Sequence, residues 1–267
     1  MKTKTTYAVA ALITAAFTSV HAGQPATALQ ATTPSLPTLH GGFGVDVSSG
    51  FVTKGIQRDT NLVSLPYFSL SLPTEVNAFG IDSASLNFAT RQATNPRSTA
   101  NNWFRSDYTA GVTFNSGSFS VTPSYQFVNA PNGNRQDYQE IGINAVYRDG
   151  GVFGLPSLNP SASVVYGTKG TPGLATGAGT FYELGITPTF NVSTTTVTLP
   201  VRVGLGGNNL YANNQRYGYT SAGLATKTPL LKNVFLNSGV TYFNADKGLN
   251  QDTNSFWLVS GGLGVEF

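Results

Sequence analysis

Apolar and polar residues alternate over long stretches of this chain, and this alternation recurs from about residue 42 to the last residue. In the segment 104–115, for example, Tyr108 and Phe114 stand at even positions, and Thr109 and Thr113 stand at odd ones. A β-strand places successive side chains on opposite faces, so such a segment predicts a strand with one apolar and one polar face. No run of 18 apolar residues and no amphipathic helix is found after the N-terminal segment.

Twelve segments carry this pattern, and each is near the roughly 9–11 residues with which a tilted strand crosses a bilayer. Strands of soluble proteins are shorter, at about 5–6 residues. The predicted strands are 42–54, 62–72, 78–91, 103–115, 118–129, 137–148, 160–168, 180–191, 195–206, 216–227, 234–245 and 255–267.

The connections between these strands alternate in length. Long connections rich in Asn, Gly, Pro and Gln are expected at 92–102, 130–136, 169–179, 207–215 and 246–254. Short turns are expected at 73–77, 116–117, 192–194 and 228–233, and two connections depart from the rule, because 55–61 is short and 149–159 is long. Long loops outside and short periplasmic turns are typical of outer-membrane barrels. We therefore predict an all-β fold, an antiparallel transmembrane β-barrel of about 12 strands with both termini periplasmic.

Three prolines, Pro123, Pro188 and Pro200, stand inside predicted strands. Proline has no N–H to donate to a neighbouring strand, and a closed barrel has no edge strand that could accommodate it. We expect a local β-bulge at each of the three.

The low content of charge separates a membrane barrel from a soluble one. Charged residues make up 10% of the chain, against about 25% in soluble domains. A soluble barrel would need charged side chains outside, whereas the polar face here is mostly Ser, Thr, Asn, Gly and Gln. Disorder is disfavoured by the 17 Phe and 12 Tyr. Aromatic residues expected at the two membrane interfaces are Trp103, Phe104, Phe119, Tyr147, Phe181, Tyr182, Phe235, Trp257 and Phe267.

The N-terminus has the features of a secretory signal peptide. Lys2 and Lys4 precede a short apolar stretch, and Val20-His21-Ala22 suits cleavage before Gly23. We predict a signal peptide at 1–22, a flexible linker at 23–40 and the barrel at 41–267. Without residues 1–22, Lys plus Arg falls from 15 to 13 against 12 acidic residues, so no basic surface remains to indicate nucleic-acid binding.

The final predicted strand ends the chain on an aromatic residue. Its apolar face consists of Trp257, Val259, Leu263, Val265 and Phe267. This pattern resembles the C-terminal targeting strand that outer-membrane barrels present to their insertion machinery. The expected partners are therefore the outer-membrane lipid and the barrel-insertion machinery, with the bacterial outer membrane as the location.

The first predicted strand carries a motif of its own, Phe51-Val52-Thr53-Lys54-Gly55-Ile56. It resembles the Tyr-Val-x-Arg-Gly-Ile/Val segment in the opening strand of the TorF-like porin family of bacterial outer-membrane proteins, whose function is uncharacterised. Phe181-Tyr182-Glu183-Leu184-Gly185 and Thr198-Leu199-Pro200 also resemble segments of that family. Phe51 and Lys54 depart from its usual Tyr and Arg. The resemblance implies a barrel with a pore and supplies no catalytic residues.

Enzymatic and metal chemistry are disfavoured by the residue inventory. The chain has no Cys, which removes thiol catalysis, thiolate metal sites and a lipid-modified Cys. Beyond the predicted signal peptide, His40 is the single His, so neither a Ser–His pair nor a His-based zinc site is expected. We predict no enzyme activity, no catalytic residue, no metal and no cofactor.

Function is expected on the polar face. Charged residues assigned to the lumen by their position in the alternation are Asp46, Lys54, Asp82, Arg105, Asp107, Glu183, Arg202 and Glu266. These side chains either select solutes electrostatically or brace the barrel as ion pairs.

Two functions remain open. The first is a narrow porin-like channel for small hydrophilic solutes, since 12 strands enclose a smaller lumen than porins of about 16–18 strands. The second is a non-conducting structural or adhesive barrel that acts through its extracellular loops. A lipid-modifying enzyme and a soluble secreted β-protein are further alternatives, and whether a loop fills the lumen is also open.

Overall fold

The computed structural model describes residues 38–78, 80–95, 102–132, 136–150, 157–170, 179–207, 210–211, 215–250 and 254–267. These residues belong to one compact unit, Thr38–Phe267. The predicted signal peptide, 1–22, and residues 23–37 of the predicted linker lie outside the described residues. The first strand begins at His40, two residues before its predicted start at residue 42.

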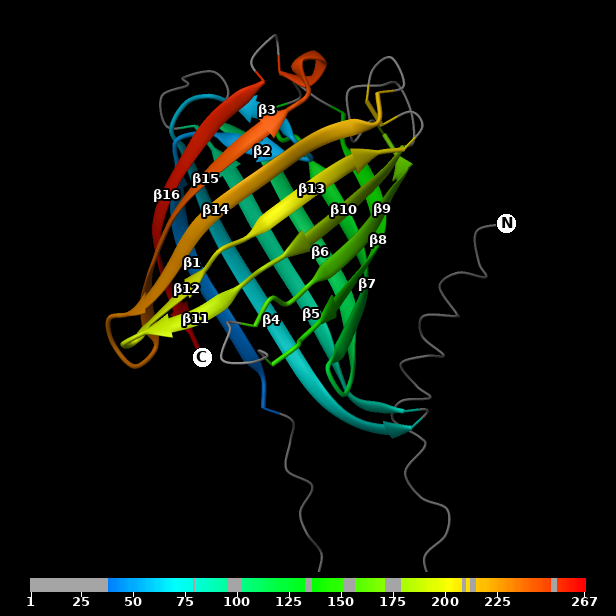
Figure 1. Ribbon diagram of the computed structural model, residues 1–267, viewed down its shortest axis with the longest axis vertical. Helices are drawn as coiled ribbons and strands as arrows, with labels where there is room; N and C mark the ends of the chain where they lie inside the picture. Colours follow the sequence, from blue (N-terminus) through cyan, green and yellow to red (C-terminus); the bar gives the residue numbers. More distant parts are fainter. Residues whose placement is uncertain are drawn as a thin grey trace, which may run out of the picture. The chain divides into compact units, whose positions relative to one another are not determined.

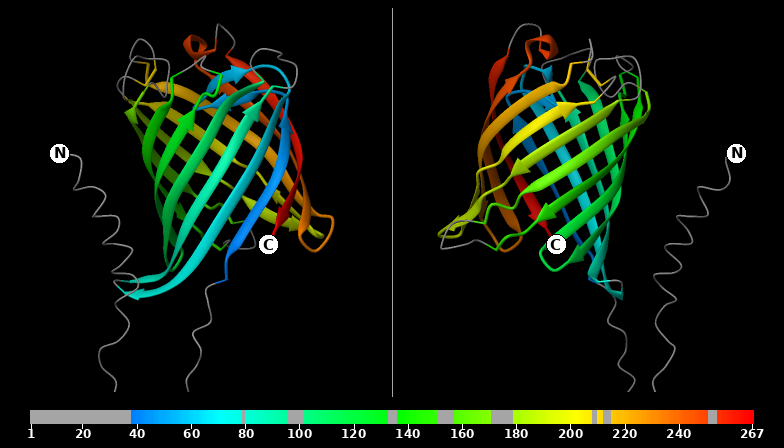
Figure 2. Two further views of the ribbon diagram at one scale, coloured as in Figure 1. Left: turned by 180° about the vertical axis from the view of Figure 1, so that it is seen from behind. Right: turned by 45° about the vertical axis from the view of Figure 1, so that its right-hand side comes forward.

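The unit is a closed antiparallel barrel of 12 strands, which confirms the predicted fold class. Figures 1 and 2 show the strands inclined around the axis of the barrel. In chain order, the first segments of the wall are β1 (His40–Ser48), β4 (Val63–Ala78), β5 (Ile81–Thr94), β6 (Trp103–Ser116), β7 (Phe119–Asn129), β8 (Tyr138–Tyr147), β9 (Ser161–Lys169) and β10 (Thr180–Ile186). They are followed by β11 (Thr189–Val192), β12 (Thr195–Thr198), β13 (Val201–Gly206), β14 (Tyr217–Pro229), β15 (Val234–Ala245) and β16 (Ser255–Glu266). β10 with β11, and β12 with β13, each form one interrupted strand of the wall.

The barrel closes between its first and last strands. β1 pairs with β16 from Gly42 opposite Glu266 to Ser48 opposite Ser260. The Gly41 N–H donates to the Phe267 carbonyl at 2.9 Å, and the Phe267 N–H donates back to the Gly41 carbonyl at 2.9 Å. The two ends of the wall therefore meet at one end of the barrel, which we call the terminus end. The opposite end, at which β10 begins and β15 ends, is called the loop end.

None of the three prolines shifts the register of its strand, so the expectation of a bulge at each is wrong. Pro123 lies inside the unbroken strand β7, and Pro188 and Pro200 lie in the interruptions of two strands. Phe114 pairs with Val121 before Pro123, and Gly111 pairs with Ser124 after it, in the same register. Proline removes one N–H but inserts no extra residue, and its carbonyl still accepts. The register shifts that do occur lie near strand ends, as at Ala93/Thr94 and Gln139/Glu140.

Pro188 and Pro200 divide β10 from β11 and β12 from β13. The Leu199 N–H donates to the Pro188 carbonyl at 2.9 Å, so the two interruptions lie on neighbouring strands. The connection after β8, which is unusually long for this end, supports the interruption. The Thr187 N–H donates to the Leu158 carbonyl at 2.7 Å, and the Thr189 N–H donates to the Ser157 carbonyl at 3.1 Å. This connection therefore supplies acceptors where the wall has lost regular pairing.

Two predicted boundaries are wrong. The turn expected at 73–77 lies inside β4, which continues to Ala78 and turns at Gly80, where a φ of 74° requires the left-handed conformation that glycine adopts without strain. The first strand ends at Ser48 and not at residue 54. The following residues form a separate hairpin of β2 (Phe51–Thr53) and β3 (Ile56–Asp59), which lies at the loop end of the barrel (Figure 1).

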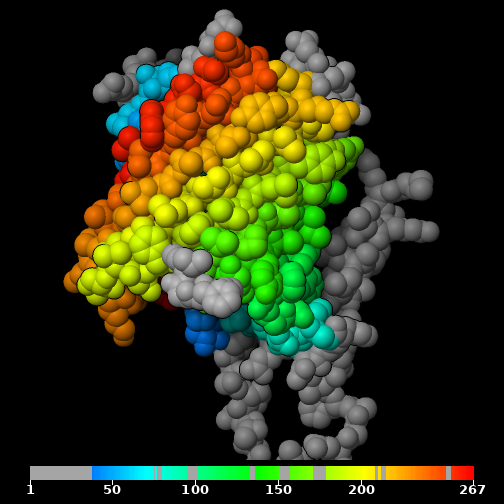
Figure 3. Space-filling model, viewed as in Figure 1, coloured from blue at the N-terminus to red at the C-terminus, as the bar shows by residue number. Residues whose placement is uncertain are grey.

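The outward face of the wall is apolar, as expected of a surface in lipid. Figure 3 shows the side chains of neighbouring strands packed together across one side of the barrel. Exposed apolar side chains on this face include Phe43, Leu86, Phe88, Ile141, Ile143, Leu184, Leu224, Leu236 and Val259. The part of the chain that the structure describes contains no helix long and apolar enough to cross a membrane.

Exposed aromatic side chains gather toward both ends of this face. Trp103, Tyr166, Tyr182, Tyr217 and Trp257 lie toward the loop end, and Phe43, Phe119, Tyr147 and Phe267 lie toward the terminus end. Such belts are typical of membrane barrels. Three residues predicted for these belts point inward instead, namely Phe104, Phe181 and Phe235.

Candidate functional site: the lumen

The inward face of the wall is polar, and part of it forms a continuous hydrogen-bonded belt. The Ser71 hydroxyl donates to Asn87 Oδ1 at 2.9 Å, and Asn87 Nδ2 donates to Thr113 Oγ1 at 2.9 Å. The Thr113 and Thr122 hydroxyl oxygens are also 2.9 Å apart. These four residues come from β4, β5, β6 and β7 and point inward by the alternation of their strands. The belt shows that the lumen presents donors and acceptors suited to water and polar solutes.

The β2–β3 hairpin folds into the lumen and is the main feature of its loop end. Its two turn residues, Lys54 and Gly55, have φ values of 51° and 79°, and positive φ at both positions is the signature of a type I′ turn. A Cβ on Gly55 would lie 2.7 Å from Cδ1 of Tyr219, so the turn requires glycine for its conformation and for its close approach to β14. The motif that resembles the TorF-like family, Phe51–Ile56, therefore forms this inward turn.

Two loop residues hold the backbone of the turn. Asn250 donates from Nδ2 to the Gly55 carbonyl at 2.9 Å and accepts at Oδ1 from the Gln57 N–H at 2.7 Å. The Tyr211 hydroxyl donates to the Lys54 carbonyl at 2.7 Å. Burial raises the pKa of Tyr211 above its ordinary value, so the hydroxyl retains the proton that it donates.

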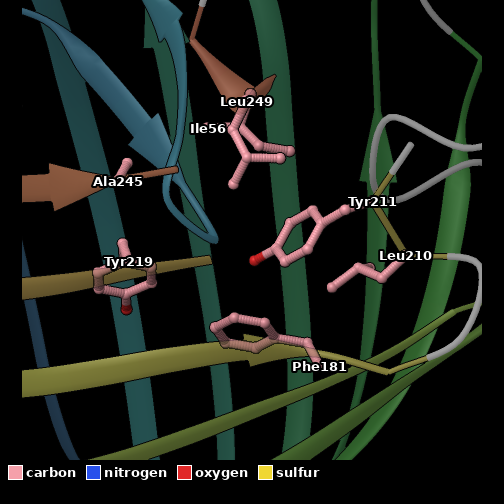
Figure 4. Packing of buried hydrophobic residues seen from close by; sticks show 7 residues of the cluster. All are labelled: Ile56, Phe181, Leu210, Tyr211, Tyr219, Ala245 and Leu249. Carbon is pink, nitrogen blue, oxygen red and sulfur yellow. The ribbon is translucent and has the colours of Figure 1, made fainter. Parts of the chain in front are cut away.

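Apolar contacts fix the hairpin on two sides of the barrel. On one side, Phe51 packs with Val63, Leu65 and Ala93, and its ring meets that of Phe104 edge to face with centroids 5.6 Å apart. On the other side, Ile56 belongs to the cluster that Figure 4 shows, where the side chains come from the hairpin, the wall and two loops. This second cluster consists of Ile56, Phe181, Leu210, Tyr211, Tyr219, Ala245 and Leu249. The hairpin therefore crosses the lumen and is buried against opposite walls.

Ion pairs accompany these contacts. Lys54 pairs with Glu140 of β8, and its Nζ lies 5.9 Å from the ring centroids of Tyr138 and Phe181. Arg105 Nε lies 2.6 Å from Asp107 Oδ1, and the Arg105 guanidinium lies 5.3 Å from the ring centroid of Phe51. Both pairs are largely buried, so the hairpin brings formal charge and apolar surface together at the loop end.

A third ion pair joins two neighbouring strands of the wall. Arg202 Nη1 lies 2.6 Å from Glu183 Oε1, and the Tyr219 hydroxyl donates to Glu183 Oε2. Both Glu183 oxygens are thereby bound. This arrangement fixes the Tyr219 side chain next to Gly55, so the ion pair also stabilises the surface against which the hairpin packs.

The terminus end of the lumen is open by comparison. A cavity of about 660 Å³ is lined there by Tyr67, Asn87, Lys227, Asn237 and Glu266, among others. Lys227 pairs with Glu266, and its Nζ lies 4.2 Å from the ring centroid of Phe235. The side chains of Lys227 and Glu266 remain 43% and 58% exposed, whereas those of Lys54 and Glu140 are 11% and 3% exposed. The charged groups of Lys227 and Glu266 are therefore exposed to the cavity at the terminus end.

Most of the predicted lumen charges lie where the alternation places them. Asp46 faces inward from β1, opposite Gly262, and its Oδ1 accepts from Asn237 Nδ2 at 3.4 Å. Arg105, Asp107, Glu183, Arg202 and Glu266 occupy the inward face of their strands. Lys54 reaches the lumen from the hairpin and not from the wall.

Asp82 is the exception, and its predicted position in the lumen is wrong. It shares the outward face of β5 with Leu86 and Phe88, is exposed, and accepts from the Gly117 N–H at 2.6 Å. Its place at the end of a strand explains this position, because a charge there meets water and headgroups and not the bilayer midplane.

Three charged residues of the inward face are absent from the sequence-based prediction, namely Arg91, Glu140 and Lys227. The same alternation identifies them. Glu140 precedes the outward Ile141, for example, and Lys227 lies an odd number of residues after the outward Leu224. His40 begins β1 and borders the cavity. No group of three or more His, Cys, Asp or Glu side chains suited to a metal occurs among the described residues.

Comparison with known proteins finds likeness in structure only. No protein-family model matches the chain, and no curated protein is similar to it in sequence. An outer-membrane channel from Pseudomonas putida F1 superimposes with a TM-score of 0.51 and 10% identity, over 91% of this chain and 100% of the channel.

Two further solved structures cover most of the chain. The NanC porin has a TM-score of 0.46 and 11% identity over 84% of this chain and 98% of the porin. Outer-membrane phospholipase A from Escherichia coli has a TM-score of 0.46 and 11% identity over 89% of this chain and 94% of the phospholipase.

The likeness to the Pseudomonas channel shows the fold. A closed barrel satisfies all of its wall hydrogen bonding internally, and here it also presents an apolar surface outward and a polar one inward. The chain is therefore an outer-membrane β-barrel, located in the bacterial outer membrane.

Proposed function

We propose that this barrel is a narrow channel for small hydrophilic solutes and that the β2–β3 hairpin forms its constriction. The observation that carries the proposal is the polar lumen, which is open as a cavity of about 660 Å³ at the terminus end and is crossed by the hairpin at the loop end. A lumen lined with hydroxyl, amide and charged groups solvates a polar solute in place of water. A purely structural barrel would have no need of this internal space.

The proposed orientation follows the usual asymmetry of such barrels. The terminus end, with the short turns at Gly117 and Ser193, faces the periplasm, and the loop end faces the exterior. In this orientation the hairpin restricts entry from outside. We also propose that the terminal strand, which ends in Val265 and Phe267, is recognised by the barrel-insertion machinery.

We propose membership of the TorF-like porin family on the strength of the Phe51–Ile56 motif. This motif forms the inward turn, and its Gly55 has the conformational role described above. We propose no enzymatic activity for the lumen. His40 is the single His among the described residues, and no structural contact pairs it with a Ser hydroxyl as a base.

A non-conducting barrel is the competing function, and the two apolar clusters around the hairpin favour it. They bury Phe51 and Ile56 against opposite walls, so the hairpin fills the loop end in this conformation. If the hairpin never moves, the barrel serves as a scaffold for its extracellular loops.

Single-channel recording in planar bilayers tests the proposal. The full chain is compared with a variant in which residues 50–60 are replaced by a short Gly-Ser turn. We expect small current steps from the full chain and much larger steps from the variant, because β2 and β3 form a separate sheet and their removal opens the loop end without breaking the hydrogen-bonded wall. A matched control replaces 230–233, the turn between β14 and β15, which lies at the terminus end and does not contact the hairpin. Absence of steps from both proteins, with heat-modifiable gel migration showing that both are folded, would establish the non-conducting function.

A further inference from the structure

The ion pairs of the lumen fall into two groups by exposure. Lys54–Glu140 and Arg105–Asp107 are largely desolvated beneath the hairpin, with side-chain exposures of 11%, 3%, 12% and 15%. In Arg202–Glu183 the Arg202 side chain is 41% exposed, but the Glu183 carboxylate is 19% exposed and has both oxygens bound. Each of these pairs therefore has at least one partner that is buried and already bound, so none of them offers both charges to a solute.

Lys227 and Glu266 differ because both remain accessible from the cavity at the terminus end. Their side chains are 43% and 58% exposed, and both line the cavity together with Tyr67, Asn87 and Asn237. Lys227 is held in place by the ring of Phe235, 4.2 Å from its Nζ. An exposed pair of this kind is worth only about 0–1 kcal/mol, so its two charges can exchange partners readily.

We propose that Lys227 and Glu266 form the solute-contacting site of the channel and set its charge preference, while the other ion pairs brace the barrel and the hairpin. This inference rests on the proposed channel function. A cation and an anion side by side give almost no net potential, yet they offer a donor and an acceptor of hydrogen bonds. The site therefore favours small solutes without net charge, neutral or zwitterionic, over ions of either sign.

The surroundings of the pair agree with this solute class. The Asn87 amide, the Asn237 amide and the Tyr67 phenol supply further uncharged polar groups along the same cavity. Asp46 accepts from the Asn237 amide and does not line the cavity, so Glu266 is the carboxylate that a solute in the cavity meets.

Reversal potentials in a KCl gradient test the inference on the full chain. We expect a value near zero for the unmodified protein. Lys227→Gln should make the channel prefer cations, and Glu266→Gln should make it prefer anions, each by roughly threefold, as one unit charge about 7 Å from a passing ion in water would do. Lys227→Arg should retain the original value. The shifts should diminish as salt is raised, because mobile ions screen the fixed charge.

Lys232→Gln is the matched control. Lys232 is exposed in the turn between β14 and β15, at the same end of the barrel, and does not line the cavity. The same change of charge there should leave the reversal potential unchanged. A shift equal to that of Lys227→Gln would overturn the site, because it would show that general surface charge sets the preference.

Two other results are decisive in different ways. Current through the channel with no shift in either Lys227→Gln or Glu266→Gln overturns the inference and leaves the channel function intact. Absence of current from every variant, including the one without residues 50–60, overturns both. Liposome swelling gives an independent readout, in which a neutral sugar should enter the unmodified protein faster than a sugar acid of similar size, and Glu266→Gln should reduce that difference.

Discussion

The two ends of the lumen use the same kinds of residue in opposite ways. At the loop end, Lys54 and Glu140 are buried by the hairpin and packed among aromatic rings. At the terminus end, Lys227 and Glu266 also form an ion pair beside an aromatic ring, but they face open space. Burial, and not residue type, therefore decides whether a charged pair holds the structure together or remains available to a solute.

This difference has an energetic consequence. Removal of one partner from a buried ion pair leaves an uncompensated charge, which costs about 3–5 kcal/mol, whereas an exposed pair contributes about 0–1 kcal/mol. Substitutions at the loop end should therefore release the hairpin, and equivalent substitutions at the terminus end should change little except selectivity.

The largest effect is expected for Ile56→Asp. Ile56 is buried among the aromatic rings of Phe181, Tyr211 and Tyr219, so the substitution places an unpaired carboxylate in an apolar cluster and removes apolar packing. We expect the docked hairpin to lose more than the roughly 2–5 kcal/mol that truncation of a buried Ile costs, because desolvation of the carboxylate adds to it, and this loss should exceed that of the other variants. The chain has no Cys, so Ala93→Cys, beneath Phe51 on the opposite wall, can report release of the hairpin through labelling by a thiol reagent. Labelling should become rapid in Ile56→Asp. Protection equal to that of the parent would show that the hairpin is not held by this cluster.

A smaller but still large effect is expected for Glu140→Ala, which leaves Lys54 buried without its anion. We expect the hairpin to be destabilised by about 3–5 kcal/mol in the limit of full burial. Lys54→Met combined with Glu140→Gln should restore much of this loss, because neither charge then remains. The same Ala93→Cys labelling measures both. If the double variant were no better than Glu140→Ala, the cost would come from lost packing and not from the unpaired charge.

Asn250→Ala should have a moderate effect. It removes two hydrogen bonds to the backbone of the turn, at the Gly55 carbonyl and the Gln57 N–H, and leaves both groups short of a partner in a buried place. We expect a loss of about 1–3 kcal/mol in hairpin docking. Asn250→Asp keeps the acceptor for Gln57 and loses the donor to Gly55, so it should lie between Asn250→Ala and the parent. Equal labelling of all three proteins would show that the loop does not hold the turn.

The alternation of residues was sufficient to predict the barrel wall. It predicts nearly every strand and which of its residues point outward or inward. In β6, for example, Phe114 points outward and Thr113 points into the lumen, as expected. The assignment of Asp82 to the lumen is wrong, although the alternation itself puts Asp82 on the outward face with Leu86 and Phe88, at the end of a strand where a charge is tolerated. It also omits Glu140, although Ile141 and Ile143 beside it indicate the inward face.

The hairpin could not be predicted in the same way. Phe51–Ile56 alternates like a strand of the wall, and only the two consecutive positive φ values at Lys54 and Gly55 turn it inward. Its burial depends on contacts with Glu140, Tyr211 and Asn250, which lie 86, 157 and about 195 residues away in the sequence. Such distant contacts leave no periodic signal, so the division of the lumen into a filled and an open end becomes visible only in the structure.

The smallest effect on stability is expected for Lys227→Ala. The pair with Glu266 is exposed, so its loss should cost at most about 1 kcal/mol, and removal of the aliphatic stem from the Phe235 ring adds little more. Labelling of Ala93→Cys should be unchanged, because the hairpin lies at the other end of the lumen. The heat needed to convert the folded gel band to the unfolded one should fall by no more than a few degrees. Release of the hairpin by Lys227→Ala would mean that the two ends of the lumen are coupled, and the exposed pair would then brace the barrel as the buried pairs do.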